Sequence, residues 1–351
     1  MEQPGQYRQF YIRKIITEVP DTRSFELAPA DGFPVEYKPG QFLTFVFFKA
    51  GGEEVRRSYS ISSAPSLNEP LRITVKRIAN GEYSRWLIDK AKEGDMLLVA
   101  GISGFFTLPP FMIPGKPIVF FAAGSGITPV YALIKTILHQ HADVPVFLIY
   151  SNTAPETTIF YKELKLLENE FNERFRIHFL FSTAADLSAA RLNAGFIERF
   201  LTQFGTEKNS TPGFYLCGPF DYMRMITIVL QGRGILPANI RKELFQVEKP
   251  AKRPSPPDKE PHHITIQTNN DTWQFSTEYP VTILQAAKAL GIPLPYSCES
   301  GQCGACAATC IQGKVWMWHN DVLLDEEIAN GRVLTCTGYP VGGDVVLKYD
   351  A

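Results

Sequence analysis

Hydrophobic and polar positions alternate over short runs in the first third of the chain. These runs are rich in β-branched and aromatic residues, which favours strands: they are Phe10–Thr17, Gln41–Phe48 and Leu71–Lys76. Dipeptides that favour turns lie close to them: Pro39-Gly40, Gly51-Gly52 and Asn80-Gly81. Several strands without helical patterns between them predict a small antiparallel β-barrel over residues 1–112.

The pattern changes after about Pro114, where apolar runs of strand length alternate with segments of helical period. The predicted strands are Ile118–Ala123, Pro145–Tyr150, Phe175–Phe181 and Gly213–Cys217, and the predicted helices are Val130–Leu138, 160–171 and 194–204. Strands that alternate with helices form a doubly wound parallel sheet. We therefore expect an α/β domain over residues 113–247, with ligands beyond the carboxyl ends of its strands.

A proline-rich segment separates this domain from the rest. Lys249–Pro261 holds five prolines and four basic residues in thirteen positions, which predicts an extended linker over residues 248–261. A solvated linker is favoured over a basic segment that contacts a partner. Two strands, Ile264–Gln267 and Thr272–Ser276, and a helix, Thr282–Gly291, then predict a small α+β domain over residues 262–351.

Composition narrows the function classes. The chain has 351 residues, which suggests two or three domains, and 35 basic against 36 acidic residues, which gives no indication of nucleic-acid binding. It has no apolar run of membrane-spanning length and no N-terminal secretory pattern. Five of the six cysteines lie between Cys298 and Cys336, which indicates metal binding rather than disulfides. We expect a cytoplasmic protein.

The cysteine spacing is the most specific signal. Cys298, Cys303 and Cys306 follow the pattern C-x4-C-x2-C, and Cys336 lies thirty residues further on. This is the plant-type arrangement of four thiolates around a [2Fe-2S] cluster. Zinc is the alternative, but it prefers two C-x2-C pairs or mixed Cys and His ligands.

The residues between these thiols are small. Gly301, Gly304 and Ala305 allow the backbone to bend sharply and to approach a cluster closely. Cys310, in the following strand-like segment, is interpreted as a small apolar residue rather than a ligand.

A candidate flavin site lies in the barrel segment. Arg57, Tyr59 and Ser60 offer a guanidinium for a phosphate, a flat ring for stacking and a hydroxyl for hydrogen bonding. The alternative is that these three residues form a solvated strand edge without a binding role. Lys76 lies ahead of the turn at Gly81, and Gly81 and Ser84 at a helix start can bind a pyrophosphate, although an ordinary helix cap explains them equally well.

A candidate nucleotide site follows the first strand of the α/β domain. Gly124, Gly126 and Thr128 lie between that strand and a helix, as in phosphate-binding turns, although a tight turn made for packing is the alternative. The segment Cys217-Gly218-Pro219 ends another strand. Cys217 is therefore either a buried structural thiol or a neighbour of a nicotinamide ring.

In this order, the motifs resemble the ferredoxin-NADP reductase superfamily fused to a C-terminal plant-type ferredoxin domain. The likeness is greatest to the reductase subunits of the phenylacetyl-CoA epoxidase group. It rests on the residues above and on Glu243-Leu-Phe245. It implies a β-barrel flavin domain, a doubly wound nucleotide domain and a β-grasp ferredoxin domain.

The resemblance also implies residue roles. Arg57 and Ser84 bind flavin phosphates, Tyr59 packs against the isoalloxazine and Ser60 hydrogen-bonds near its N5 atom. Residues Gly124, Gly126 and Thr128 hold the nicotinamide nucleotide's pyrophosphate, Cys217 borders the hydride path, and Glu243 and Phe245 lie near the flavin. FAD is favoured over FMN.

The sequence departs from the family in two places. A G-P-x-G segment of relatives stands here as Gly101-Ile-Ser-Gly104. Ser151-Asn-Thr153 also follows the second strand of the nucleotide domain, where relatives that use NADPH often carry arginine. A 2′-phosphate favours a guanidinium, so this absence favours NADH or use of both nucleotides, unless Lys162 or Arg191 substitutes.

The sequence therefore predicts an NAD(P)H-dependent oxidoreductase. Electrons pass from NADH or NADPH through FAD and a [2Fe-2S] cluster to an acceptor protein, with an oxygenase component as the first choice. A reductase of ferredoxin, flavodoxin or ferric iron is one alternative, and a non-enzymatic redox sensor or zinc-stabilised interaction protein is another. Trp316 and Trp318 are either an acceptor-docking surface or core residues of the small domain.

Overall fold

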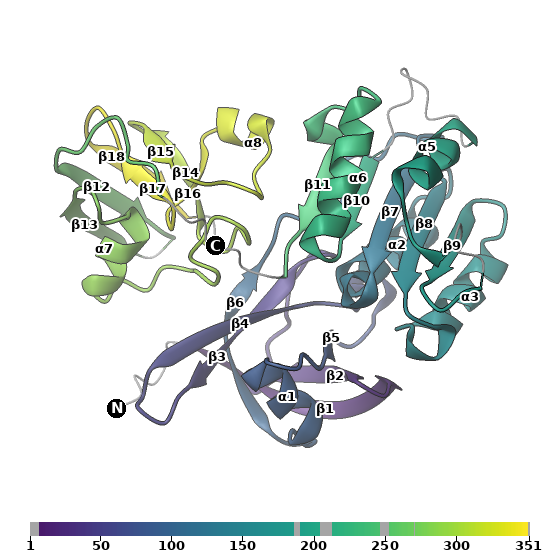
Figure 1. Cartoon of the computed structure of the whole chain (residues 1–351). Coiled ribbons are helices and arrows are strands. Elements are labelled where there is room, and N and C mark those ends of the chain that lie inside the picture. Colours follow the sequence, from purple (N-terminus) through teal and green to yellow (C-terminus); the bar gives the residue numbers. More distant parts are fainter. Residues whose placement is uncertain (1–6, 186–189, 204–212, 246–252, 270, 350–351) are drawn as a thin grey trace. The chain divides into compact units, whose positions relative to one another are not determined.

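The structure is a computed structural model that describes all residues except 1–6, 186–189, 204–212, 246–252, 270 and 350–351. The chain forms two compact units (Figure 1). The first contains Tyr7–Ile102 and Phe106–Phe245. The second contains the described residues after Phe245, together with Ser103–Phe105. Each unit is described separately.

The first unit begins with a six-stranded sheet of order β4-β3-β6-β1-β2-β5. Its elements are β1 (Arg8–Val19), β2 (Thr22–Pro29), β3 (Phe42–Phe48), β4 (Glu54–Ser60), β5 (Arg72–Lys76), β6 (Met96–Ser103), the short η1 (Pro65–Leu67) and helix α1 (Glu82–Asp89). A bridge between Ile61 and Ile73 joins the two edges and closes the sheet around an apolar core. This confirms the predicted barrel, although the sequence pattern gave no separate signal for β2 and β6.

The same unit continues with a five-stranded parallel sheet of order β11-β10-β7-β8-β9. Its strands are β7 (Ile118–Ala123), β8 (Val146–Asn152), β9 (Phe175–Phe181), β10 (Gly213–Cys217) and β11 (Ile240–Glu243). Its helices are α2 (Ile127–Gln140), α3 (Tyr161–Glu170), α5 (Ala194–Gln203) and α6 (Phe220–Gly232), with short turns η2 (Gly124–Gly126), η3 (Pro155–Thr157) and η4 (Pro237–Asn239).

Two apolar clusters hold this sheet between its helices (Figure 1). One cluster joins α2 and α3 to one face, and the other joins α5 and α6 to the opposite face. The doubly wound arrangement is confirmed. The predicted helices differ at their ends, since α2 begins three residues before Val130 and Phe160 lies outside α3 in a left-handed conformation. The end of the predicted helix 194–204 lies partly outside the described residues.

The second unit is a mixed sheet of order β13-β12-β18-β14-β16 with a separate β15-β17 pair. The elements are β12 (His262–Gln267), β13 (Thr272–Thr277), α7 (Ile283–Ala289), β14 (Ala307–Gln312), β15 (Val315–Met317), α8 (Asp325–Ala329), β16 (Arg332–Leu334), β17 (Gly338–Pro340) and β18 (Val345–Lys348). A capping box between Thr282 and Gln285 fixes the start of α7. The helix packs its apolar face into the core of this sheet, as expected for a β-grasp domain.

The described part of the proline-rich segment is attached to the second unit. The Oδ2 atom of Asp258 accepts a hydrogen bond from the Gly342 amide (2.7 Å) and lies 2.7 Å from His262 Nε2. Backbone amides and His262 together lower the pKa of Asp258 to about 2. This end of the predicted linker is therefore not a free tether. Residues 248–252 of the linker lie outside the described residues.

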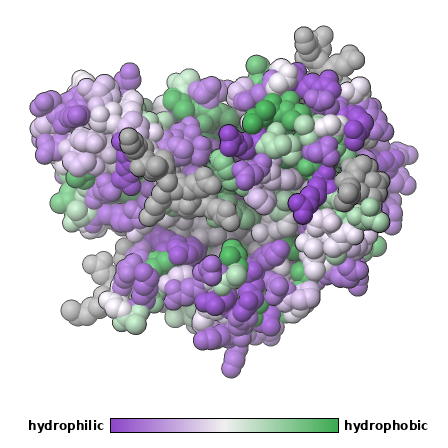
Figure 2. All heavy atoms as spheres, viewed as in Figure 1, coloured by the Kyte–Doolittle hydropathy of each residue, from purple (hydrophilic) through white to green (hydrophobic). Residues whose placement is uncertain are grey.

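No helix among the described residues is long and apolar enough to cross a membrane. On the face shown in Figure 2, hydrophilic residues predominate and hydrophobic ones occupy smaller areas.

An ion pair joins the barrel to the nucleotide sheet within the first unit. Lys135 of α2, whose side chain is 4% exposed, donates to Glu69, which follows η1. The same carboxylate oxygen accepts a hydrogen bond from the Ala64 amide, and the Lys135 ammonium lies 4.3 Å from the centre of the Tyr131 ring. Burial lowers the pKa of Lys135, because a low-dielectric environment disfavours its charge.

Replacement of Glu69 by Gln should destabilise this unit by about 2 kcal/mol, because it leaves a buried ammonium without its counter-charge. Chemical denaturation of the full chain measures the change. Glu53→Gln, which breaks the exposed Lys49–Glu53 pair, is the matched control and should have no measurable effect. Equal stability of the Glu69→Gln variant and the parent would show that this pair does not hold the two parts together.

Candidate functional site

The four predicted cluster thiols are brought together by pairing in the second unit. Cys306 directly precedes β14, and Cys336 follows β16 by two residues; Ala307 and Leu334 are partners in the antiparallel ladder. The Thr335 amide and hydroxyl both donate to the Cys306 carbonyl, at 3.3 and 3.1 Å. These bonds hold the two ends of the site side by side.

Cys298 and Cys303 come from the loop before β14. The amide of Ser300 donates to Cys298 Sγ and the amide of Ala305 donates to Cys303 Sγ, both at 3.5 Å. Hydrogen bonds from Cys303 and Cys336 lower the pKa of the Cys298 thiol. Hydrogen bonding to Cys298 and Cys306 raises the pKa of Cys336 in turn. The four sulfur atoms therefore converge, with backbone N–H groups directed at the sulfurs.

The loop has the backbone that the spacing predicted. Gly301 and Gly304 have φ values of 79° and 74°, a region that side chains disfavour. A Cβ atom at Gly301 would lie 2.6 Å from the His319 carbonyl oxygen. Four convergent thiols fit a two-iron cluster, in which each iron takes two of them.

Cys310 is separate from this group. Its thiol is only half-buried and donates weakly to the carbonyl oxygens of Gln312 (3.4 Å) and Gly313 (3.6 Å). Trp318 is mostly buried, 9% exposed, with the Arg253 guanidinium 5.2 Å from its ring centre. Trp316 is half-buried in β15 and its ring lies 6.2 Å from that of Tyr339. The docking interpretation therefore applies better to Trp316 than to Trp318.

A hollow of about 340 Å³ in the first unit collects the predicted flavin residues. It is lined by residues of β4, β5, α1, the turn before α2 and the segment after β11. The predicted flavin-site residues among them are Arg57, Tyr59, Ser60, Lys76, Gly81, Ser84 and Phe245; Thr128, which was predicted for the nucleotide site, lines this hollow as well. Tyr59 is largely enclosed, and burial raises the pKa of its hydroxyl. Arg57, Tyr59 and Ser60 thus all line one hollow.

The start of α1 forms one wall of this hollow. The amides of its first turn have no partner within the helix, so they can bind an anion. The Ser84 hydroxyl donates to the Gly81 carbonyl (3.1 Å) and accepts from the Ile78 amide (3.3 Å). A Cβ atom at Gly81 would lie 2.4 Å from Ser84 Oγ. Gly81 and Ser84 therefore shape the turn, and the amides of the first helical turn are the donors available to an anion.

A second hollow, of about 330 Å³, lies at the carboxyl ends of β7, β8 and β9. Its lining residues are Lys76, Gly124, Ser151, Asn152, Thr153, Thr157, Ser182, Ala190, Arg191, Leu192 and Tyr222. Lys76 and Gly124 are predicted members, and Arg191 is one of the two cations proposed to replace the missing arginine. Lys162, the other cation, does not line it. Ser151 Oγ and Asn152 Nδ2 are buried at this edge, where their side chains interact with the hydroxyls of Tyr222 and Tyr150.

The glycine turn before α2 is required for packing. Gly124 has a φ of 54°, and a Cβ atom at Gly126 would lie 2.0 Å from the Cys217 carbonyl oxygen. Thr128 Oγ1 donates to the Ser125 carbonyl (2.9 Å). Of these three predicted nucleotide-site residues, Gly124 lines the second hollow, Thr128 lines the flavin hollow, and Gly126 lines neither, so packing explains Gly126.

Ser60 and Glu243 join the barrel to the last strand of the parallel sheet. Ser60 Oγ donates to Glu243 Oε1 at 3.4 Å, and Glu243 is the parallel partner of Cys217. Burial raises the pKa of Glu243 to about 8, although the Ser60 hydrogen bond opposes this shift. Burial and the nearby Glu243 carboxylate raise the pKa of Cys217. A carboxyl group that titrates near neutral pH can hold or release a proton there.

Cys217, Gly218 and Pro219 lie beside the hollows rather than in their walls. Cys217 is fully buried, 0% exposed, behind the glycine turn. A Cβ atom at Gly218 would lie 3.0 Å from Ala123 Cβ, and Pro219 precedes the first residue of α6. Sequence reasoning missed Tyr83 and Tyr222 as lining residues, because nothing in their local sequence shows which way their rings point.

The domain families that match the chain follow the same order. They are an oxidoreductase FAD-binding domain (residues 10–108), an oxidoreductase NAD-binding domain (120–228) and a 2Fe-2S iron-sulfur cluster binding domain (266–341). The chain is 30% identical to the glycine betaine monooxygenase reductase subunit of Pseudomonas aeruginosa, over 96% of this chain and 93% of that protein. It belongs to this family of flavin and iron-sulfur reductases.

Two further relatives agree with that assignment. A component of the 1,2-phenylacetyl-CoA epoxidase of Escherichia coli is 29% identical, with 98% of each chain covered. Phthalate dioxygenase reductase shares the fold with a TM-score of 0.57 and 24% identity, over 98% of each chain. The chain is thus an NAD(P)H-dependent oxidoreductase with FAD and a [2Fe-2S] cluster as cofactors, which excludes the non-enzymatic alternative.

Glu243→Gln should change how stability depends on pH. In the parent, the folded state keeps the Glu243 proton up to about pH 8, whereas the unfolded chain loses it near pH 4.5. The group's contribution is therefore full below about pH 4.5 and is lost as the pH rises to 8, by up to about 1.4 kcal/mol per pH unit.

Urea unfolding of the flavin-free protein at pH 5, 6.5 and 8 measures this effect. The parent should lose stability relative to Glu243→Gln across that range, because glutamine does not titrate. Parallel pH profiles of the two proteins would contradict the raised pKa of this carboxyl group.

Proposed function

We propose that this reductase passes electrons from NADPH to an oxygenase component. One observation carries the proposal: a flavin hollow and a nucleotide hollow share Lys76 in one unit, and the other unit holds four convergent thiols. When bound, FAD accepts a hydride from the nicotinamide, and the iron-sulfur cluster carries single electrons onward. The residues of the chain bind, orient and electrostatically support these groups.

The flavin hollow supplies three kinds of contact. Arg57 and the amides at the start of α1 would hold the phosphates by charge-assisted hydrogen bonds. Tyr59 would pack against the flavin ring, and the Ser60 hydroxyl would lie near its N5 edge. Phe245, which is 45% exposed in the wall of this hollow, would cover the ring when no nucleotide is present.

Glu243 and Ser60 would hold and release a proton at the N5 edge of the flavin ring. Their side chains already form a hydrogen bond, and Glu243 keeps its proton near neutral pH. Cys217, directly beside Glu243 in the sheet, would fill the space next to the nicotinamide rather than react, because burial keeps its thiol protonated.

The nucleotide hollow favours NADPH. Two cations, Lys76 and Arg191, line it, and none of the described residues that line it is Asp or Glu. A site for NADH commonly places a carboxylate at the ribose 2′-hydroxyl, whereas a guanidinium accommodates a 2′-phosphate. Arg191 would therefore replace the arginine that the Ser151–Thr153 segment lacks. This revises the expectation of NADH, or of both nucleotides, that rested on that segment alone.

Arg191→Ala should lower kcat/KM for NADPH by about tenfold or more, because a charge-assisted phosphate contact is lost. The value for NADH should change little. Steady-state kinetics with both nucleotides measures the split, and Lys162→Ala, whose side chain lies outside the hollow, is the control. An equal loss with both nucleotides would assign Arg191 to the shared part of the two molecules instead.

Cys303→Ser tests the order of electron flow. The variant should retain NADPH-dependent reduction of ferricyanide, which the flavin can serve, and should lose reduction of a purified oxygenase component. The iron and acid-labile sulfide content of the purified variant should also fall. If a variant without the cluster still reduced the oxygenase component at the parent's rate, the cluster would not lie on the electron-transfer path.

The identity of the electron acceptor is inferred from relatives and not from the geometry of the sites. The relatives from P. aeruginosa and E. coli described above are named as parts of a monooxygenase and an epoxidase. A reductase of ferredoxin, flavodoxin or ferric iron remains the second candidate, and turnover with each purified acceptor separates the two. We expect the protein in the cytoplasm, where a reducing environment keeps the four thiols available for iron.

A further inference from the structure

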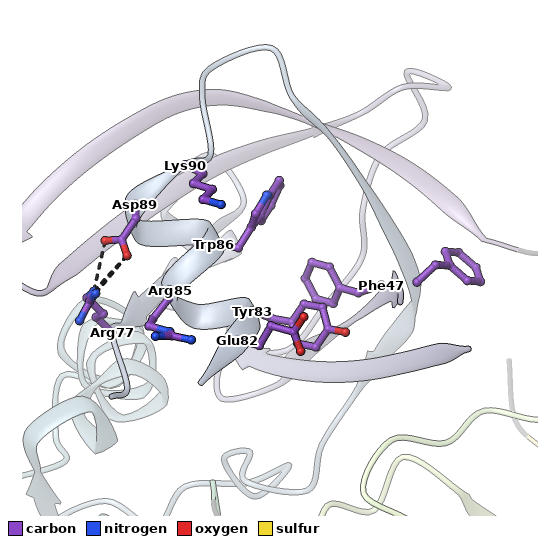
Figure 3. Close-up of a pocket in the computed structure, with 9 residues that line it drawn as sticks. Phe47, Arg77, Glu82, Tyr83, Arg85, Trp86, Asp89 and Lys90 are labelled. Carbon is purple, nitrogen blue, oxygen red and sulfur yellow. Dashed lines mark hydrogen bonds and ion pairs between the residues drawn. The ribbon is translucent and has the colours of Figure 1, made fainter. Parts of the chain in front are cut away.

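A third hollow in the first unit, of about 620 Å³, lies beside the flavin hollow. Figure 3 shows Tyr83 and Trp86 projecting into it from α1 and Phe47 from β3. Tyr83 lines the flavin hollow as well, so the third hollow belongs to the flavin site. Polar side chains without an assigned role lie in the second unit, around the loop that carries three of the four cluster thiols.

The segment 319–321 contacts this loop, residues 298–306, through its backbone. The Asp321 amide donates to the Gly301 carbonyl at 3.0 Å. The His319 carbonyl oxygen lies so close to Gly301 that a Cβ atom there would be only 2.6 Å away. The segment therefore fixes the backbone of the loop at Gly301.

The Asp321 side chain extends this contact to a sulfur atom. Its Oδ2 atom accepts a hydrogen bond from Gln302 Nε2 (3.3 Å) and lies 2.8 Å from His319 Nε2. Gln302 Oε1 accepts from the Ser300 hydroxyl (3.2 Å), and the Ser300 amide donates to Cys298 Sγ (3.5 Å). A chain of hydrogen bonds thus leads from Asp321 through Gln302 and Ser300 to a predicted cluster thiol.

This hydrogen-bond chain passes from the surface into the interior of the second unit. The Asp321 side chain is 31% exposed, whereas Gln302 is 6% and Ser300 is 4% exposed. A buried polar side chain is costly unless it is hydrogen-bonded. Asp321 therefore keeps Gln302 in the orientation that holds Ser300, and Ser300 directs its N–H at Cys298.

Two properties of this arrangement affect the reduction potential of a bound cluster. Hydrogen bonds to the sulfurs raise the potential, because they stabilise the reduced form with its extra negative charge. A carboxylate near the cluster lowers it, because like charges repel. Asp321 contributes to both, the first through Gln302 and the second through its own charge.

We propose that Asp321 is a positioning residue for the [2Fe-2S] cluster and that, together with Gln302, it sets the cluster's reduction potential. Neither residue is a ligand. The potential of the cluster decides which acceptors it can reduce, so these two side chains adjust the protein to its partner. The inference rests on the four cluster thiols described above and not on the identity of the acceptor.

Two variants of the full-length, cluster-loaded protein test the proposal. Asp321→Asn removes the charge but keeps an oxygen that can accept from Gln302. At the parent's midpoint potential, the ratio of reduced to oxidised cluster should therefore rise about threefold or more. Gln302→Leu has a similar volume but breaks the hydrogen-bond chain. The same ratio should then fall about threefold or more, because the Ser300 N–H is held less firmly at the sulfur.

An anaerobic redox titration, followed by the electron paramagnetic resonance signal of the reduced cluster, measures both ratios. Asp325→Asn, at an exposed carboxylate of α8 in the same unit, is the control and should leave the ratio unchanged.

A shift in the same direction in both variants, or an unchanged potential in either, would overturn the proposal. If Gln302→Leu retains too little iron for the titration, Asp321→Asn decides alone, and an unchanged potential in that variant would overturn it. Failure of the cluster site itself looks different, since the parent would then hold no iron and give no signal.

Discussion

The junction between the barrel and the parallel sheet is the constraint on which the reductase unit depends. A hydride moves only between atoms in contact, so the flavin and nucleotide sites must face each other at a fixed separation. The 3.4 Å hydrogen bond from Ser60 to Glu243 connects the two parts at the site itself. The buried Lys135–Glu69 pair and the hydrogen bond from Tyr215 to the Thr107 carbonyl (3.0 Å) connect them elsewhere.

The chemistry of the site follows from what this junction buries. Glu243 lies at the end of β11, beside a fully buried thiol, and no cation among the described residues lowers its pKa. Its pKa therefore rises into the physiological range. The cluster loop differs, since backbone amides of Ser300 and Ala305 donate to the sulfurs of Cys298 and Cys303. One unit thus holds a proton near neutral pH, and the other directs N–H donors at two of its four thiols.

The sequence predicted the parts whose signal is local. The four cysteines and the glycines between them depend on spacing within one loop, and the barrel and doubly wound sheet depend on hydrophobic period. The strand β11 carries no such signal, because its residues 240–243 are short and mixed in character and take their form from pairing with β10. Its last residue, Glu243, was placed near the flavin only through the family resemblance.

Other parts depend on contacts between distant segments. The aromatic surface formed by Phe47, Tyr83 and Trp86 joins a strand to a helix 35 residues later, so neither stretch reveals it alone. Ser84 illustrates the reverse case, because a motif suggested a phosphate contact, whereas its hydroxyl is engaged by the turn that it closes. The position of Arg191 could not be predicted from its local sequence either, because only the folded chain brings it to the same hollow as Ser151.

The central claim is that this chain converts a two-electron donor into a source of single electrons. An anaerobic titration of the purified protein with NADPH, followed by visible absorption, tests it most directly. With one FAD and one [2Fe-2S] cluster per chain, the account predicts loss of both the flavin and the iron-sulfur bands, with an end point at about 1.5 equivalents, or three electrons. An end point at one equivalent with the iron-sulfur bands intact, or no bleaching at all, would contradict it.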